Sequence, residues 1–251
     1  MDTITLELLL SLSAVAGLAG FVDAIAGGGG LLTVPALLWA GLPPVQALAT
    51  NKAQAVFGSF TASAHFVRHG RVDLRRLAPA IACTFIGAAT GALAVQHLHP
   101  ELLSRLVPVL LIGFALYFLF SPRIGSADAE HRISHPAFAL LIGTGVGFYD
   151  GFFGPGTGTF FAAAFVLLLG YNLTRATAGT KVLNFTSNFA ALLLFAANGQ
   201  VLWPLGLTMG LAQIAGAWTG ARLVVRHGSR LVRPLLVVVS LALSLKLLLS
   251  D

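Results

Sequence analysis

The sequence predicts an all-α polytopic membrane protein with two inverted repeats of about five helical segments each, including short or broken helices after glycine-rich stretches. Three observations support this: the composition, a motif that occurs twice, and the placement of the arginines. Of the 251 residues, 57% are hydrophobic and 10% are charged, whereas a soluble domain carries about 25% charged residues. The apolar runs are continuous rather than alternating, which favours membrane-spanning helices over a barrel.

The charge of the chain also fits a membrane protein. Its formal net charge is +6, but the arginines lie mostly in short connectors between apolar runs, as the positive-inside rule expects. No basic stripe or aromatic platform accompanies this charge, so we do not expect nucleic-acid binding. Asp2 and Glu7 precede the first apolar run and no basic residue does, so this run is predicted to be a retained helix rather than a signal peptide.

The apolar runs divide the chain into two halves of similar plan. The first half, residues 1–120, has predicted segments at about 4–24, 31–40, 45–67, 77–95 and 102–120. The hydrophilic stretch 121–135 is predicted to be a cytoplasmic linker. The second half, residues 136–251, has predicted segments at about 136–153, 159–169, 176–197, 202–225 and 231–249. The second segment of each half is only about half a bilayer long as a helix.

A motif of an aspartate, a glycine-rich break and a lysine occurs once in each half. In the first half, Asp23 precedes four consecutive glycines, and Lys52 follows after the next apolar run. In the second half, Asp150 precedes a stretch with three glycines, and Lys181 follows in the same way. The chain has only three lysines, and two of them occupy this matching position. Ionisable residues inside apolar segments are costly, so by default they suggest function.

The repeat extends beyond the motif. Gly70 matches Gly199, and Thr90 matches Thr219, at one constant shift along the chain. Both fourth segments also carry two glycines four residues apart, a pattern that predicts close helix packing. These glycines are Gly87 and Gly91 in the first half, and Gly216 and Gly220 in the second.

The arginines predict that the two halves are inverted. The connector after the third segment is basic in the first half, whereas its counterpart at 198–204 has no charged residue. After the fourth segment the situation is reversed: the connector of the second half is the basic one. The basic connectors hold Arg68, Arg71, Arg75 and Arg76, and Arg222, Arg226, Arg230 and Arg233. If basic loops face the cytoplasm, the halves have opposite orientation, the linker is inside and both termini are outside.

Inverted repeats with short, glycine-broken segments indicate a secondary transporter. A helix that begins at such a break exposes unpaired N–H groups and a partial positive charge, which bind anions. Two such helix starts could face one another at the interface between the halves. The alternatives are that the glycines only allow close packing and that the lysines only reach the surface or neutralise charge. The predicted substrate-binding residues are Gly28, Gly29, Gly30, Asn51, Lys52, Gly156, Thr157, Thr159, Lys181 and Asn184.

The sequence is compatible with three roles for the two aspartates of the motif and does not distinguish between them. Asp23 and Asp150 could pair with the lysines, cap the broken helices or carry a coupling proton or ion; pairing of Asp23 with Lys52 inside one half is one such arrangement. Gln54, Asn188, Gln213 and further polar residues in the apolar segments favour hydrogen bonds between helices.

Enzyme classes are not supported by the sequence. It has no His-Glu-x-x-His, no Gly-x-Ser-x-Gly, no cysteine pair and no redox motif, so we expect no catalytic residues, no metal site and no cofactor. The expected partners are a small anionic solute and the lipid bilayer, with assembly into a homo-oligomer left open. A passive anion channel, which would use the same helix starts as a filter, is the rival to a carrier.

At the repeated motif the chain resembles the sulfite exporter TauE/SafE family, and especially its YfcA-like members. The stretches that carry the resemblance are 20–30, 49–52, 147–155 and 179–184. The resemblance implies a multi-pass transporter of small anions, such as sulfite or organosulfonates, in the bacterial inner membrane. It does not fix which anion this chain carries.

Overall fold

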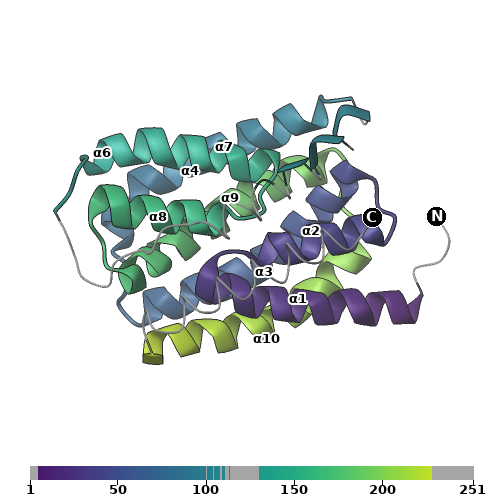
Figure 1. Ribbon diagram of the computed structural model, residues 1–251, viewed down its shortest axis with the longest axis horizontal. Coiled ribbons are helices and arrows are strands. Elements are labelled where there is room, and N and C mark those ends of the chain that lie inside the picture. Colours follow the sequence, from purple (N-terminus) through teal and green to yellow (C-terminus); the bar gives the residue numbers. More distant parts are fainter. Residues whose placement is uncertain are drawn as a thin grey trace.

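The computed structural model describes residues 5–99, 101–103, 105–107, 109–110, 113 and 130–227, and the regular structure in this part is entirely helical (Figure 1). The helices are α1 (Leu6–Ala26), α2 (Gly29–Trp39), α3 (Pro44–Arg68), α4 (Leu74–Gln96), α6 (His135–Phe138), η1 (Ala139–Gly143), α7 (Thr144–Phe152), α8 (Thr157–Leu169), α9 (Leu173–Ala197) and α10 (Trp203–His227).

These helices confirm the predicted segments wherever the structure describes them in full. The end residues differ from the predicted ones by three positions or fewer, and α6, η1 and α7 together form the first segment of the second half. The fifth segment of the second half and the part of the linker at 121–129 lie outside the described residues. The fifth segment of the first half is described only in part.

Three of the described helices are long and apolar enough to cross a membrane. The candidate spans are Leu6–Ile25, Leu74–Gln96 and Leu173–Ala197. Two shorter apolar helices, Gly29–Trp39 and Thr157–Leu169, are the ones that follow the glycine-rich breaks. The chain therefore has the composition of a membrane protein with both full-length and half-length helices.

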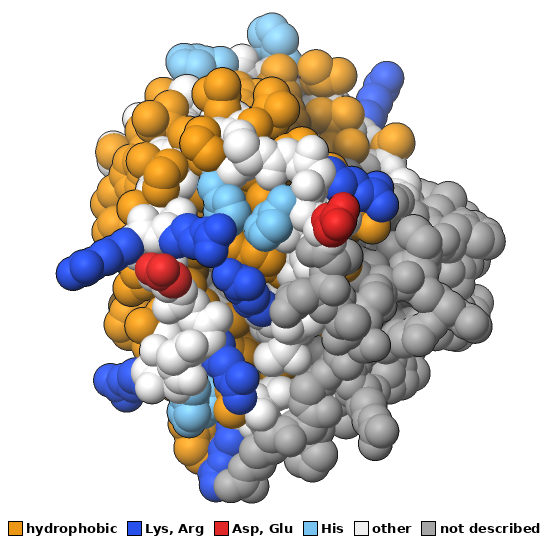
Figure 2. Space-filling model, turned by 90° about the vertical axis from the view of Figure 1, so that its left-hand side faces the viewer, with side chains coloured by type: hydrophobic (Ala, Val, Ile, Leu, Met, Phe, Trp, Pro, Cys, Tyr) orange, Lys and Arg blue, Asp and Glu red, His pale blue; other side chains and the backbone are white. Residues whose placement is uncertain are grey.

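Polar and apolar side chains are distributed as expected for a protein surrounded by lipid. Hydrophobic side chains cover much of the outer surface (Figure 2), and Trp39 and Leu6 are 85% and 72% exposed. In contrast, Lys52 and Lys181 are 0% and 1% exposed. Buried charges must be paired or used, so the interior of the bundle is where a functional site is expected.

Corresponding helices of the two halves pack in corresponding ways. Helix α1, from the first half, packs along α10, from the second. Helix α7, the counterpart of α1, packs along α4, the counterpart of α10. Helices α3 and α9, the third segments of the two halves, contact each other. Each first segment is thus held by the fourth segment of the other half.

The paired glycines of the fourth segments allow this close packing, as predicted. A Cβ atom at Gly220 would lie 2.6 Å from the carbonyl oxygen of Phe21 in α1, and Gly216 faces the backbone of the same helix. Gly87 and Gly91 meet the backbone of α7 in the same manner. Larger side chains at these positions would push the two halves apart.

Candidate functional site

The two glycine-rich breaks lie against each other in the interior. Helix α1 ends at Gly27, whose φ of +84° is in the left-handed region that favours glycine. A Cβ atom there would lie 2.6 Å from the carbonyl carbon of Gly158, in the first turn of α8. A Cβ atom at Gly30, in the first turn of α2, would lie 3.2 Å from the Cα atom of Pro155. The starts of the two short helices are therefore adjacent.

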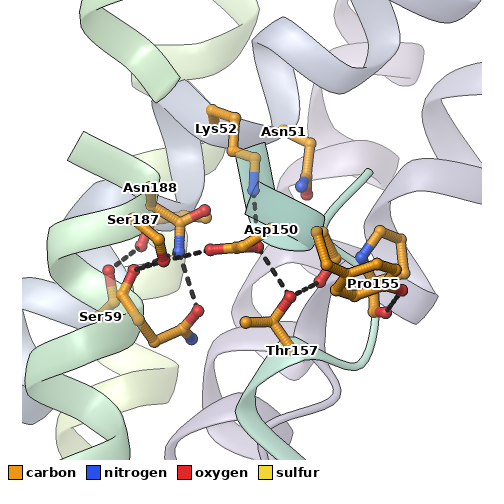
Figure 3. A network of polar contacts seen from close by, with 12 residues as sticks. Asn51, Lys52, Ser59, Asp150, Pro155, Thr157, Ser187 and Asn188 are labelled. Atoms are coloured by element: carbon orange, nitrogen blue, oxygen red, sulfur yellow. Dashed lines mark hydrogen bonds and ion pairs between the residues drawn. The ribbon is translucent and has the colours of Figure 1, made fainter. Parts of the chain in front are cut away.

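The lysine of the first half pairs with the aspartate of the second half. The Lys52 Nζ atom lies 2.7 Å from Oδ1 of Asp150. The same carboxylate accepts a hydrogen bond from Thr157 Oγ1 at 2.9 Å and another from the hydroxyl of Ser187. Figure 3 shows these three donors converging on Asp150. The Asp150 side chain is 2% exposed, so the pair is buried and its carboxylate is well satisfied.

The lysine of the second half pairs with the aspartate of the first half. Lys181 Nζ lies 3.2 Å from Oδ2 of Asp23 and also donates to the Asp23 backbone carbonyl. The carboxylate further accepts from the Gly29 backbone N–H at 3.3 Å and from Asn184 Nδ2 at 3.4 Å. These bonds are longer than those at the other aspartate, and the Asp23 side chain is 12% exposed. The two pairs correspond in position but not in tightness.

The pairs are exchanged between the halves, which corrects one of the arrangements considered from the sequence. Pairing of Asp23 with Lys52 inside one half is wrong, because Lys52 bonds to Asp150 and Lys181 to Asp23. The physical reason is the packing of the third segments: α3 and α9 contact each other at the centre of the bundle. Each third segment therefore presents its lysine to the broken first segment of the opposite half.

Buried amides surround the ion pairs. Asn51 Oδ1 accepts from Thr33 Oγ1 at 2.6 Å and from Gln54 Nε2 at 2.9 Å. The first of these bonds joins α3 to α2, and the bond from Asn184 to Asp23 joins α9 to α1. The interhelical role expected for the polar residues is confirmed for these two asparagines.

A pocket of ≈ 320 Å³ opens between the two breaks. Both halves contribute to its lining, which consists of Asp23, Gly27, Gly30, Asn51, Lys52, Ala55, Asp150, Gly154, Gly156, Gly158, Asn184, Asn188 and Gln213. Polar and glycine residues make up all of this lining except for Ala55. Such a pocket offers backbone and amide contacts together with buried charge.

The structure brings most, but not all, of the predicted site residues to this pocket. Those in the lining are Asp23, Gly30, Asn51, Lys52, Asp150, Gly156 and Asn184. Gly28, Gly29, Thr157, Thr159 and Lys181 are not part of it. Thr157 and Lys181 instead bond to the two aspartates, so their side chains act on the carboxylates rather than on the open space.

Gln213 is the pocket residue whose position the sequence does not reveal. It lies on α10 and is 2% exposed. A Cβ atom at Gly20 or at Gly58 would clash with its side chain, at 2.6 Å and 2.7 Å from its Cγ atom. These two glycines thus leave room for Gln213 to reach the pocket between α1 and α3. Its Oε1 atom is buried and has no hydrogen-bond partner among the described residues.

The fold and this site define a polytopic helical membrane protein with a buried polar pocket where broken helices meet, an arrangement typical of secondary transporters. The sequence pattern of the family described as Sulfite exporter TauE/SafE matches residues 12–247. The chain therefore belongs to the sulfite exporter TauE/SafE family and is a membrane transporter of that family.

Close relatives extend over nearly the whole chain. The probable membrane transporter protein YfcA of Escherichia coli K12 is 51% identical over 234 residues, which cover 93% of this chain and 87% of the relative. A probable membrane transporter protein of Haemophilus influenzae is 45% identical over 244 residues, covering 97% and 96%. A probable membrane transporter protein, ORF9, of a Sinorhizobium species is 45% identical over 248 residues, covering 99% and 95%. No solved structure matches the chain significantly.

Proposed function

We propose that the protein is a secondary transporter of a small anion in the bacterial inner membrane, with its substrate site in the pocket between the two glycine-rich breaks. The observation that carries the proposal is the pair of exchanged Asp–Lys contacts at this pocket. The family's description as a sulfite exporter favours sulfite or a related organosulfonate as the substrate class.

The charge balance of the pocket favours an anion over a cation. The two lysines and two aspartates cancel in formal charge, so neither sign dominates through side chains. Helices α2 and α8 both begin at the pocket, and each helix start adds about half a positive charge and backbone N–H groups. Asn51 and Gln213 supply further amide groups, whereas Asn184 Nδ2 already donates to Asp23. A small oxyanion can take up these donors without displacing either ion pair.

The looser pair is the natural place for coupling to protons. Asp23 is held by bonds of 3.2–3.4 Å and is partly open to the pocket, whereas Asp150 is held by Lys52 at 2.7 Å and by two hydroxyls. Protonation of Asp23 would leave Lys181 with one uncompensated positive charge beside the bound anion. Proton and anion would then bind together, while Asp150 and Lys52 keep a structural role.

Alternating access is the mechanism that this arrangement supports best. We infer the inverted orientation of the halves from the exchange of basic connectors, and the reciprocal packing of α1 on α10 and of α7 on α4 supports it. Both ion pairs link one half to the other. Rocking of the halves would change the geometry of these pairs and move access from one membrane face to the other.

Counterflow in proteoliposomes tests the proposal. Vesicles preloaded with unlabelled sulfite, or with a sulfonate, should accumulate the labelled anion several times faster than empty vesicles, because a carrier exchanges its substrates. A passive channel would give flux without this stimulation, and a structural membrane protein would give no flux. Either result over a panel of small oxyanions would overturn the carrier mechanism.

A further inference from the structure

A second and larger pocket lies at one end of the bundle, away from the two breaks. It has a volume of ≈ 480 Å³ and is formed by the start of α4, by α6, by the end of α8 and by the start of α9. Figure 2 shows this end of the molecule, where arginine and histidine side chains gather on an otherwise largely apolar surface. Neither the transport site nor the family resemblance accounts for this pocket.

The rim of the pocket is basic. Arg71, Arg76 and Arg175 line it, against a single carboxylate, that of Asp73. This carboxylate already caps α4, where it accepts from the backbone N–H groups of Arg75 and Arg76. Within the described part of the chain, none of the three lining arginines forms a salt bridge. The rim therefore holds a surplus of positive charge with donors free for an anion.

Neighbouring side chains hold this rim in place. The guanidinium carbon of Arg175 lies 3.8 Å from the centre of the Tyr171 ring, a cation–π contact. The Tyr171 hydroxyl lies 3.0 Å from Nε2 of His135. Burial, followed by the charges of Arg76, His131 and Arg175, lowers the pKa of His135. Burial is the larger cause, and the neighbouring cations add to it.

The floor of the pocket is apolar. It includes Phe138, Phe165 and Leu169, which belong to one buried cluster. The rings of Phe138 and Phe165 have their centres 4.7 Å apart and are tilted by 34°. These three side chains are at most 1% exposed, and the apolar surface that a ligand can contact includes the partly exposed Val72 and Leu77. A molecule with an anionic head and an apolar body can use both this surface and the basic rim.

The positions that correspond to the basic rim in the other half of the repeat are not basic. At the shift that aligns Gly70 with Gly199, the three lining arginines correspond to uncharged residues. The counterparts of Arg71, Arg76 and Arg175 are Gln200, Leu205 and Gln46. Leu205 packs with Leu12 and Leu37 in a buried apolar cluster at that place. The repeated fold therefore does not require the arginines. The positive-inside rule accounts for the charge of this connector but not for the convergence of Arg71 and Arg76 with Arg175 on one pocket.

We propose that this pocket binds the phosphate of an anionic amphiphile, with the phosphate on Arg71, Arg76 and Arg175 and the apolar part on Val72 and Leu77. An anionic phospholipid of the cytoplasmic leaflet has this chemistry, and basic pockets between helices on that side suit its headgroup. A free phosphate compound shares only the first part of it. The proposal concerns binding alone and does not depend on which anion the central pocket carries.

The test compares lipids and variants in the purified full-length protein. Phosphatidylglycerol should raise the melting temperature more than phosphatidylcholine, with saturation at a low number of lipids per protein. Arg76→Gln should weaken this apparent affinity about tenfold, the size expected for the loss of one charge-assisted contact, and Arg175→Lys should weaken it less. Arg75→Gln is the matched control, because Arg75 neighbours Arg76 and does not line the pocket.

Two further arms identify the ligand and guard against misfolding. Ala80→Met adds volume at the floor without changing charge, so it should weaken phosphatidylglycerol binding and spare that of inorganic phosphate. Protection by inorganic phosphate that equals protection by the lipid would assign the pocket to a soluble phosphate compound. Equal losses in Arg75→Gln and Arg76→Gln, or no difference between the two lipids and no effect of phosphate, would overturn the proposal.

Discussion

Replacement of Lys52 by Met is the perturbation that tests the exchanged ion pairs most directly. Lys52 is fully buried and lies 2.7 Å from Asp150, whose side chain is 2% exposed. Met matches the length of the side chain but leaves the carboxylate without a cation. Removal of one partner from a buried pair costs about 3–5 kcal/mol, because the remaining charge stays desolvated. Thr157 and Ser187 still bond to the carboxylate, which places the expected loss at the lower end of this range.

Removal of both partners should recover most of that loss. A buried ion pair contributes little net stability when both charges are replaced by apolar or neutral groups, so Lys52→Met with Asp150→Asn should be far more stable than Lys52→Met alone. Lys52→Met with Asp23→Asn should show no such recovery, because those two side chains are not partners. The expected coupling energy is about 3 kcal/mol for the first combination and below about 1 kcal/mol for the second.

The assay is reversible unfolding of the purified protein in mixed micelles, followed by helix content, for the wild type, the single variants and the two double variants. Stability is the readout, so the cycle is independent of the substrate. Larger coupling of Lys52 with Asp23 than with Asp150 would refute the exchanged pairing. Equal coupling with both would mean that the four charges act as one cluster rather than as two pairs.

Three further predictions follow from other parts of the structure. Gly216→Leu should destabilise the protein strongly because Gly216 meets the α1 backbone. Gly145→Ala should be neutral or stabilising by up to about 1 kcal/mol in thermal unfolding, because a Cβ atom added there would meet no atom within 4 Å outside its own stretch of helix. In a cysteine-free background, an impermeant thiol reagent added to spheroplasts should label Asn198→Cys but not its repeat counterpart His69→Cys; the reverse result would contradict the proposed orientation. Because burial and neighbouring cations lower the pKa of His135, stability should fall as the pH decreases below its usual value of 6.5, and His135→Gln should remove that part of the pH dependence in melting curves.

Much of the fold was accessible from the sequence because the membrane imposes simple length and polarity rules. Continuous apolar runs located the helices, and the glycines after Asp23 and Asp150 located the two breaks that shorten α2 and α8. The repeat also identified Lys52 and Lys181 as a related pair. These features depend on local composition and on spacing along the chain, so no knowledge of tertiary contacts was required.

The partners of the buried charges were not accessible in this way. The exchange of pairs depends on how α3 and α9 cross at the centre of the bundle, which no spacing within one half encodes. Gln213 reaches the pocket only through the gap left by Gly20 and Gly58, which lie on two other helices. No pattern within the segment of Gln213, Gly20 or Gly58 predicts these contacts. They arise only when the three helices pack together.

The two ion pairs differ although the motif repeats, because the residues around the two aspartates differ. The α8 start offers the hydroxyl of Thr157 to Asp150, and α9 adds that of Ser187. At the corresponding place near Asp23, the α2 start offers the backbone N–H of Gly29, and Gly58 occupies the position that matches Ser187. The loss of two hydroxyls leaves Asp23 with longer bonds and opens the space that Gln213 enters. The two halves thus place an aspartate and a lysine in equivalent positions, and a few substitutions around them make one pair tight and fully buried and leave the other with longer bonds and partly exposed.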